Sequence, residues 1–227
     1  MADLPREERP GILFTAVVDE EGFSHGTNQV IQSGLWKTSD VILISEPTHE
    51  RVMLGARGRH IVRLVAQGRK CHAARPYLGV NAIEMLAKIV SQVDKLPVKS
   101  DPLLGRESWA TLSFHGESDG LSLPETAVAI LDHHIVTPDE WDIATEPLAD
   151  LIEKMKIDCV SVEKFERPTP DMLPYVVDGN NPYVRMFITS CARILWDKPA
   201  ITYGESVGDY NYFGAYTDRP VIVFGPN

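Results

Sequence analysis

The pattern of apolar and polar positions predicts two α/β segments on either side of a middle part of different character. Apolar runs typical of strands buried on both faces occur at residues 11–18, 41–45 and 221–224. Helices are predicted over residues 24–36 and 183–196. Alternating strands and helices are typical of a layered α/β fold, so we expect the two flanking segments to form one α/β domain.

Residues 57–167 are predicted to form an inserted α+β domain. Its predicted elements are a strand at 60–66, a helix at 81–96, strands at 109–114 and 126–131, a helix at 137–156 and a strand at 158–165. Asn81 would cap the first helix and Pro97 would end it. The order β-α-β-β-α-β is that of a ferredoxin-like fold. The α/β domain would then consist of residues 1–56 and 168–227.

Composition and charge limit the classes of function. The 227 residues, 44% of them hydrophobic, are enough for one large or two modest domains. A formal net charge of −10 argues against nucleic acid and anionic membranes as partners, since both attract basic surfaces. The sequence holds no apolar run of about 18 residues and no signal core, which predicts a soluble, cytoplasmic protein. The expected partners are small molecules or peptides.

Carboxylates follow two of the predicted strands at the point where each strand ends. Asp19, Glu20 and Glu21 come directly after the first apolar run, and Glu46 and Pro47 follow the second. Open α/β sheets build their sites at the carboxyl ends of strands, so we expect the three glutamates to converge. Adjacent carboxylates repel one another unless a cation is present, and zinc or manganese accepts carboxylate ligands. The alternative is an acidic turn in solvent.

Taken in order, these features resemble the peptidase M20 family of metal-dependent peptidases and deacylases. The matching motifs are Asp19-Glu20-Glu21 after a strand, Ser45-Glu46-Pro47-Thr48, Gly58, Gly68-Arg69-Lys70-Cys71-His72-Ala73, Gly79-Val80-Asn81-Ala82 and Phe224-Gly225-Pro226. The resemblance covers nearly the whole chain. It implies a zinc-peptidase-like α/β catalytic domain interrupted by a ferredoxin-like lid that also forms a homodimer. It further implies hydrolysis of an amide bond in a peptide or an N-acyl amino acid.

The resemblance assigns roles to individual residues. Glu20 matches the general base that takes a proton from a metal-bound water, while Glu21 and Glu46 each match a ligand of one of two divalent ions. The ions would be zinc, with manganese or cobalt as alternatives. Asp19 would be a supporting residue. His72 resembles the lid histidine that reaches the partner subunit's site and stabilises an oxyanion there.

Four further residues match positions that border the substrate in this family. Asn81 belongs to the Gly-Val-Asn-Ala motif, and His134 lies where many relatives carry an arginine that binds a substrate carboxylate. Ser206 and Gly208 match a glycine loop beside the substrate. Structural roles stay open for these residues, since His134 could simply end a strand and the loop could be an ordinary turn.

Several family ligands have no match in the sequence. The family pattern places a histidine two residues before an aspartate upstream of Glu20 and another histidine shortly after Pro226, and the sequence shows neither. The remaining histidines show no ligand spacing. We therefore expect either a hydrolase chain truncated at both ends or a dimerising protein that does not catalyse. A non-hydrolytic α/β binding domain is a third alternative.

Overall fold

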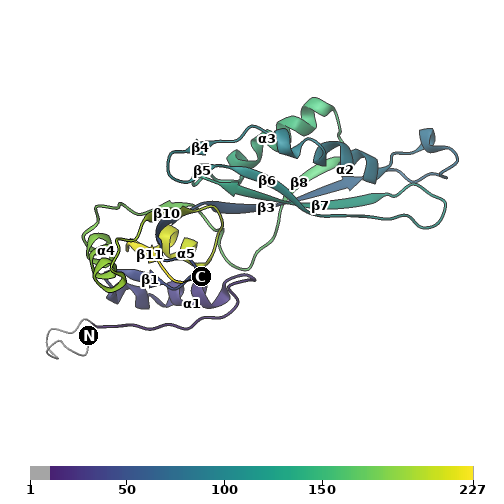
Figure 1. Cartoon of the computed structure of the whole chain (residues 1–227). Helices are drawn as coiled ribbons and strands as arrows, with labels where there is room; N and C mark the ends of the chain where they lie inside the picture. Colours follow the sequence, from purple (N-terminus) through teal and green to yellow (C-terminus); the bar gives the residue numbers. More distant parts are fainter. Residues whose placement is uncertain (1–10, 227) are drawn as a thin grey trace.

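The computed structural model describes residues 11–226 and has two parts joined by two crossings of the chain (Figure 1). The first part is built on a five-stranded sheet in the order β1-β11-β2-β10, with β9 paired to β2. Its strands are β1 (Ile42–Ile44), β2 (Val52–Ala56), β9 (Tyr175–Val176), β10 (Ile201–Gly204) and β11 (Val221–Val223). Residues 1–10 and Asn227, which belong to the predicted segments 1–56 and 168–227, lie outside the described residues.

Helices cover both faces of this sheet, as an α/β fold requires. They are α1 (His25–Ser33), α4 (Pro182–Leu195) and α5 (Asp209–Tyr216), with a 3-10 turn, η2, at Leu35–Thr38. One face packs against α1 and α5 through Met53, Tyr175, Phe213, Val221 and Val223. The other packs against α4 through Val52, Leu54, Val184, Ile188 and Ile222. No helix within residues 11–226 has the length and apolarity needed to cross a membrane.

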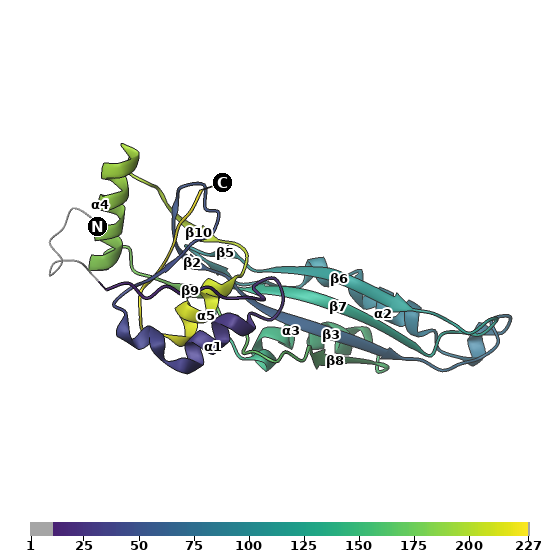
Figure 2. The same cartoon turned by 90° about the horizontal axis from the view of Figure 1, so that it is seen from below.

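The second part, the lid, is a four-stranded antiparallel sheet that carries two helices on one face (Figure 2). Its strands are β3 (Gly58–Gln67), β6 (Ser108–Gly116), β7 (Thr126–Ile135) and β8 (Val160–Lys164), in the order β6-β7-β3-β8. Its helices are α2 (Ala82–Val90) and α3 (Trp141–Met155), and its smaller elements are η3 (Pro76–Leu78), η4 (Val93–Lys95) and the hairpin of β4 (Ser100–Asp101) and β5 (Gly105–Arg106). This is the ferredoxin-like arrangement. The predicted fold class, α/β with a ferredoxin-like lid, is confirmed.

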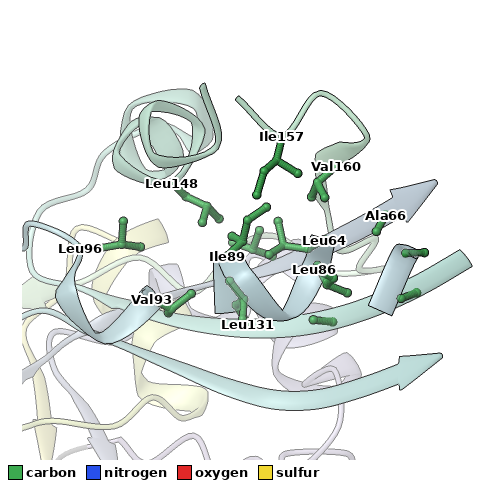
Figure 3. Packing of buried hydrophobic residues seen from close by; sticks show 14 residues of the cluster. Leu64, Ala66, Leu86, Ile89, Val93, Leu96, Leu131, Leu148, Ile157 and Val160 are labelled. Atoms are coloured by element: carbon green, nitrogen blue, oxygen red, sulfur yellow. The ribbon is translucent and has the colours of Figure 1, made fainter. Parts of the chain in front are cut away.

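The lid has a hydrophobic core of its own between its sheet and its helices (Figure 3). The fully buried side chains of this core include Leu64, Leu86, Ile89, Leu131 and Leu148. Asn81 starts α2 as predicted, because its side chain accepts hydrogen bonds from the backbone N–H groups of Ile83 and Glu84. A separate core is what a domain needs in order to fold independently.

Asn211 ties both crossings between the two parts together. It is fully buried, and its side-chain amide donates to the backbone carbonyls of Arg57 at 2.8 Å and Leu173 at 2.9 Å. Arg57 lies on the outgoing crossing and Leu173 on the returning one. The side-chain carbonyl of Asn211 accepts from the backbone N–H of Gly208 at 3.0 Å. One side chain of α5 therefore holds the lid crossings against the loop that precedes α5.

The strand predicted at residues 11–18 is wrong. This segment is extended but pairs with no strand, and Ile12, Phe14 and Val18 are 68%, 83% and 73% exposed. In the described chain β1 is the edge of the sheet, with β11 as its neighbour. An apolar run becomes a strand only where a neighbouring strand accepts its backbone hydrogen bonds, and nothing in residues 11–226 does so here.

Several observed elements were not predicted from the sequence, and one predicted helix begins elsewhere. The unpredicted elements include β2, β9, α5 and the β4-β5 hairpin. β2 is short and ends at Ala56, in a glycine-containing stretch where the sequence predicted only the crossing between the two domains. α3 starts at Trp141 with Glu140 as its N-cap, four residues after the start predicted at residue 137. The hydroxyl of Thr137 donates to the side chain of Asp139.

Candidate active site

A tight turn presents the predicted carboxylates. Asp19 has a φ of 69°, a left-handed conformation that aspartate adopts more readily than most residues. Its backbone carbonyl accepts from the N–H of Ser24 at 2.7 Å, and its side chain accepts from the N–H of Phe23 at 3.1 Å and from the ring of His25. The hydrogen bond with His25 lowers the pKa of Asp19. Asp19 therefore shapes the turn that carries the two glutamates after it.

Four acidic side chains, Glu20, Glu21, Glu46 and Asp209, make up what we call the carboxylate cluster. Glu46 follows β1, and Asp209 opens α5. Burial raises the pKa of Glu20, and the charges of Asp209, Glu46 and Glu21 raise it further. Burial also raises the pKa of Glu46, with the charges of Asp209 and Glu21 adding to it. The structure thus brings the three predicted glutamates within range of one another's charge.

Asp209, which the sequence placed only in the glycine loop with Ser206 and Gly208, is the member of the cluster that was not predicted to meet the glutamates. It is 5% exposed, and its Oδ2 accepts from the hydroxyl of Thr27 at 2.5 Å. Its backbone N–H donates to the carboxylate of Glu20. Gly208 lets the start of α5 approach this closely, because a Cβ there would lie 3.2 Å from Oε1 of Glu20. The sequence signal that could have found Asp209 was an acidic residue after the loop that follows a strand. This is close to the pattern used for Glu46, which follows a strand directly.

The cluster has the chemistry of a cation site without its complete geometry. Carboxylates suit divalent ions, and a cation would relieve the repulsion that raises the pKa values of Glu20 and Glu46. Within residues 11–226, however, no group of three or more His, Cys, Asp or Glu side chains is arranged to hold a metal ion. These residues do not make a metal site by themselves.

Replacing Glu46 by glutamine should stabilise the metal-free chain at neutral pH. The pKa of Glu46 is raised above its ordinary 4.5 in the folded chain, so ionisation of Glu46 costs stability as the pH rises above that value. The gain should be at most about 1 kcal/mol, because the side chain is only partly shielded from solvent. It should vanish below about pH 4, where both states bind the proton.

Urea unfolding of the wild type and Glu46→Gln at pH 4 and pH 7.5 measures this difference. The exposed neighbour Glu50, replaced by glutamine, serves as the control and should change stability at neither pH. Equal stabilities of Glu46→Gln and the wild type at pH 7.5 would show that Glu46 is not strained by its neighbours.

His72 lies in the loop after β3 and Asn81 starts α2, so both lie at the end of β3 that is away from the crossing at Gly58. β3 leaves the crossing at Gly58 and runs for 10 residues, about 33 Å, before the loop that contains His72. His72 is exposed, and its Nδ1 accepts from the N–H of Ala74 at 3.1 Å. Asn81 acts as the helix cap described above. The structure does not bring either residue to Glu20 of the same chain.

His134 and Ser206 lie nearer the crossings. His134 is the penultimate residue of β7 and pairs with Arg59 of β3, whose guanidinium donates to Asp132 at 2.7 Å. Burial lowers the pKa of His134; Asp132 opposes this effect, while Arg59 and Arg57 add to it. Ser206 is exposed in the loop between β10 and α5. These positions surround the crossing, and only Gly208 of the predicted substrate residues touches the cluster.

Comparison with known proteins identifies the family. Residues 54–158 match the family described as the peptidase dimerisation domain. A probable carboxypeptidase of Arthroderma gypseum is 30% identical over 233 residues, which cover 95% of this chain and 48% of that protein. The M20 family metallo-carboxypeptidase Sso-CP2 from Sulfolobus solfataricus shares the fold with a TM-score of 0.65 at 16% identity, over 91% of this chain and 61% of that one. Nearly the whole chain is therefore similar to proteins of the M20 peptidase family.

Further relatives agree with this similarity. An uncharacterized protein of Escherichia coli K12, YgeY, is 27% identical over 240 residues, covering 99% of this chain and 59% of that protein. Aminopeptidase PepT from Bacillus cereus has a TM-score of 0.73 at 14% identity, over 92% of this chain and 54% of that one. The chain thus spans roughly half to three fifths of the relatives' length. The predicted family is confirmed, while the residue roles stay predictions.

Proposed function

We propose that this chain is part of an M20-type hydrolase that cleaves an amide bond in a peptide or an N-acyl amino acid. The observation that carries the proposal is the carboxylate cluster, where Glu20, Glu46 and Asp209 meet between the end of β1 and the start of α5. Acidic groups that raise one another's pKa in a partly buried position are typical of active sites. Relatives named as carboxypeptidase and aminopeptidase support the reaction class but differ in the peptide end they act on.

In this proposal Glu20 is the general base. Its pKa is raised by burial and by neighbouring carboxylates, which makes it a better proton acceptor than a solvent-exposed glutamate. The backbone N–H of Asp209 donates to its carboxylate, and that hydrogen bond orients the side chain. A Cβ at position 208 would lie 3.2 Å from Oε1 of Glu20, so Gly208 avoids a close contact with that oxygen. Glu20 would accept the proton of the water that attacks the amide.

We further propose Glu21 and Glu46 as carboxylate ligands of divalent ions, zinc first and manganese or cobalt as alternatives. The support is the cluster's charge, which a cation would offset. Two carboxylates do not complete a site for either ion, so further ligands are needed. Asp19 would support the site by holding the turn, as its hydrogen bonds to Phe23 and His25 indicate.

The homodimer proposed for this chain would form through the lid. β6 is an edge strand, paired only with β7 among the described strands, and such edges readily pair with a second chain. His72 lies too far from Glu20 of its own chain to act there, so a role in catalysis would require a partner subunit's site. Asn81, His134, Ser206 and Gly208 stay candidates for substrate contact, with Gly208 the best placed.

The lid alone, residues 57–167, should fold and dimerise, because it has its own core and an open edge at β6. Circular dichroism should show the mixed helix and strand content, and sedimentation equilibrium should give twice the monomer mass. Leu112→Arg, at an exposed position of β6, should shift the fragment towards monomer. Leu103→Arg, exposed on the β4-β5 hairpin, should not. A wild-type fragment that is folded and monomeric would contradict the proposed interface.

The test of the function is an activity assay with defined metal. The 227-residue chain, and the complete gene product if the reading frame continues beyond it, would be stripped with a chelator and reloaded with zinc, manganese or cobalt. Each form would be offered dipeptides and N-acyl amino acids. Metal-dependent release of a free amino acid supports the proposal. No hydrolysis of either class by the complete gene product under any metal would end it.

The second candidate is a dimerising protein without catalytic activity. It is favoured by the incomplete ligand set within residues 11–226. It predicts a stable dimer of the complete gene product, no metal-dependent hydrolysis and no change in any activity on replacing Glu20.

A further inference from the structure

A cavity of about 180 Å³ lies inside the lid, apart from the carboxylate cluster. It is formed between the first turns of α3 and residues 97–107, the segment that includes the β4-β5 hairpin. Its apolar walls are Pro97, Val98, Ile143, Ala144 and Pro147. Its polar lining is Lys99, Glu107, His133 and Asp139. A cavity of about 150 Å³ holds benzene, so this one has room for about six non-hydrogen atoms.

His133 lines this cavity, and both of its ring nitrogens lack a hydrogen-bond partner within residues 11–226. The residue is 3% exposed. Its ring stacks on Trp109, with 3.7 Å between ring centroids and 9° between the planes. Burial, followed by the nearby charge of His60, lowers the pKa of His133 to about 3. The ring is therefore neutral and offers one N–H donor and one acceptor lone pair. Buried polar groups nearly always have hydrogen-bond partners, so the two unpaired nitrogens of His133 indicate that a partner is missing.

Glu107 and Asp139 together give the cavity more negative charge than Lys99 alone can offset. The side chain of Glu107 is 5% exposed, and its Oε2 accepts from the backbone N–H of Lys99 at 2.9 Å. The ammonium group of Lys99 is paired with Asp139, with 2.5 Å between Nζ and Oδ2, so those two charges cancel. Nε2 of the neutral His133 lies 3.7 Å from Oε2 of Glu107. The lining therefore carries one net negative charge beside an acceptor nitrogen.

We propose that this cavity is a binding site for a small primary ammonium ion with a short apolar chain. The ammonium group would donate to Oε2 of Glu107 and to the lone pair of Nε2 of His133. The apolar chain would lie against the proline, valine and alanine side chains of the wall. Two of the lining residues, Lys99 and Ile143, are 50% and 53% exposed, so the cavity reaches the protein surface beside them. An anion would be repelled by Glu107, and the described residues do not group to hold a metal ion.

Isothermal titration of the full chain with n-butylammonium chloride tests the site, with n-butanol and sodium butyrate as matched probes. We expect saturable binding of one butylammonium per chain. Butanol should bind at least about tenfold more weakly, because it lacks the charge that strengthens the hydrogen bond to Glu107, and butyrate should not bind. No saturable binding up to roughly 50 mM, the range expected for a ligand of five heavy atoms, would overturn the proposal. Equal binding of all three probes would overturn it too.

His133→Phe separates ligand binding from folding. Phenylalanine keeps a ring that can stack on Trp109 and removes both unpaired nitrogens, so the urea midpoint should stay the same or rise. The affinity for butylammonium should fall at least about tenfold. His115→Phe, at an exposed position of β6, is the control and should bind as the wild type does. Unchanged binding in His133→Phe would overturn the proposal.

A measurement on the wild type covers the case in which His133→Phe does not fold. The ¹⁵N resonances of the His133 ring should shift on addition of butylammonium and not on addition of butyrate. Ring resonances that do not move at saturating butylammonium would overturn the proposal. None of these readouts depends on hydrolytic activity, so the outcome is independent of the proposed function.

Discussion

Glu20→Gln is expected to lower kcat for amide hydrolysis by about 10²–10⁴-fold, with little change in KM. The glutamine side chain has the same size and can still accept the hydrogen bond from the backbone N–H of Asp209, so the turn should keep its shape. It cannot accept a proton from the attacking water. The loss should therefore appear in the chemical step and leave substrate binding largely intact. Initial rates on whichever peptide or N-acyl amino acid proves active give both constants.

Two controls make this result interpretable. Glu153→Gln, on the exposed side of α3, changes the same functional group in the lid and should leave kcat unchanged. The metal content of Glu20→Gln should equal that of the wild type, whereas Glu21→Gln should lower it. A Glu20→Gln protein as active as the wild type would remove Glu20 from the mechanism. If Glu20→Gln also lost its metal, Glu20 would be a ligand instead of the base.

Asn211→Ala should lower the free energy of unfolding by about 2–4 kcal/mol. The substitution leaves two buried groups, the carbonyl of Arg57 and the N–H of Gly208, and the partly buried carbonyl of Leu173 without their partner. Asn211 is 0% exposed, so water cannot replace the lost hydrogen bonds without entering the crossing. Each buried group left unpaired costs about 1–3 kcal/mol in proteins, and carbonyls tolerate the loss better than N–H groups. Urea unfolding measures the difference.

Asn180→Ala is the matched control, because Asn180 is exposed and precedes α4. Its effect should stay within about 0.5 kcal/mol. A loss below about 1 kcal/mol for Asn211→Ala would show that the crossings are held by other contacts. Hydrogen exchange should further show the largest increase in Asn211→Ala at the crossings, around residues 57 and 173, because the lost hydrogen bonds are there.

The lid could be predicted from the sequence because its signals are local and agree with one another. α2 begins with an N-capping asparagine and repeats apolar residues at helical spacing, and the strands alternate along their length. The segment 11–18 had an equally apolar pattern and formed no strand. The apolar pattern shows that this segment can pair as a strand. Pairing also needs a neighbouring strand, which the sequence of the segment does not encode.

The candidate site was only partly predictable for the same reason. The positions of Glu20 and Glu46 could be read from the sequence because both follow apolar runs. Asp209 could not be placed, since its proximity to Glu20 depends on α5, a helix with a weak sequence signal that contains Gly214 and four aromatic residues. The hydrogen bond from Thr27 to Asp209 spans 182 positions of the chain.

The sequence by itself determined the order of most elements, the ferredoxin-like lid, the family and the presence of acidic residues at a strand end. Local hydrogen bonding, side-chain periodicity and turn chemistry act over a few residues, and these features depend on nothing more distant. Only the tertiary structure decided which acids meet, how far His72 lies from them and which side chain holds the crossings. Those three features depend on packing between segments far apart in the chain, which is set by the fold as a whole.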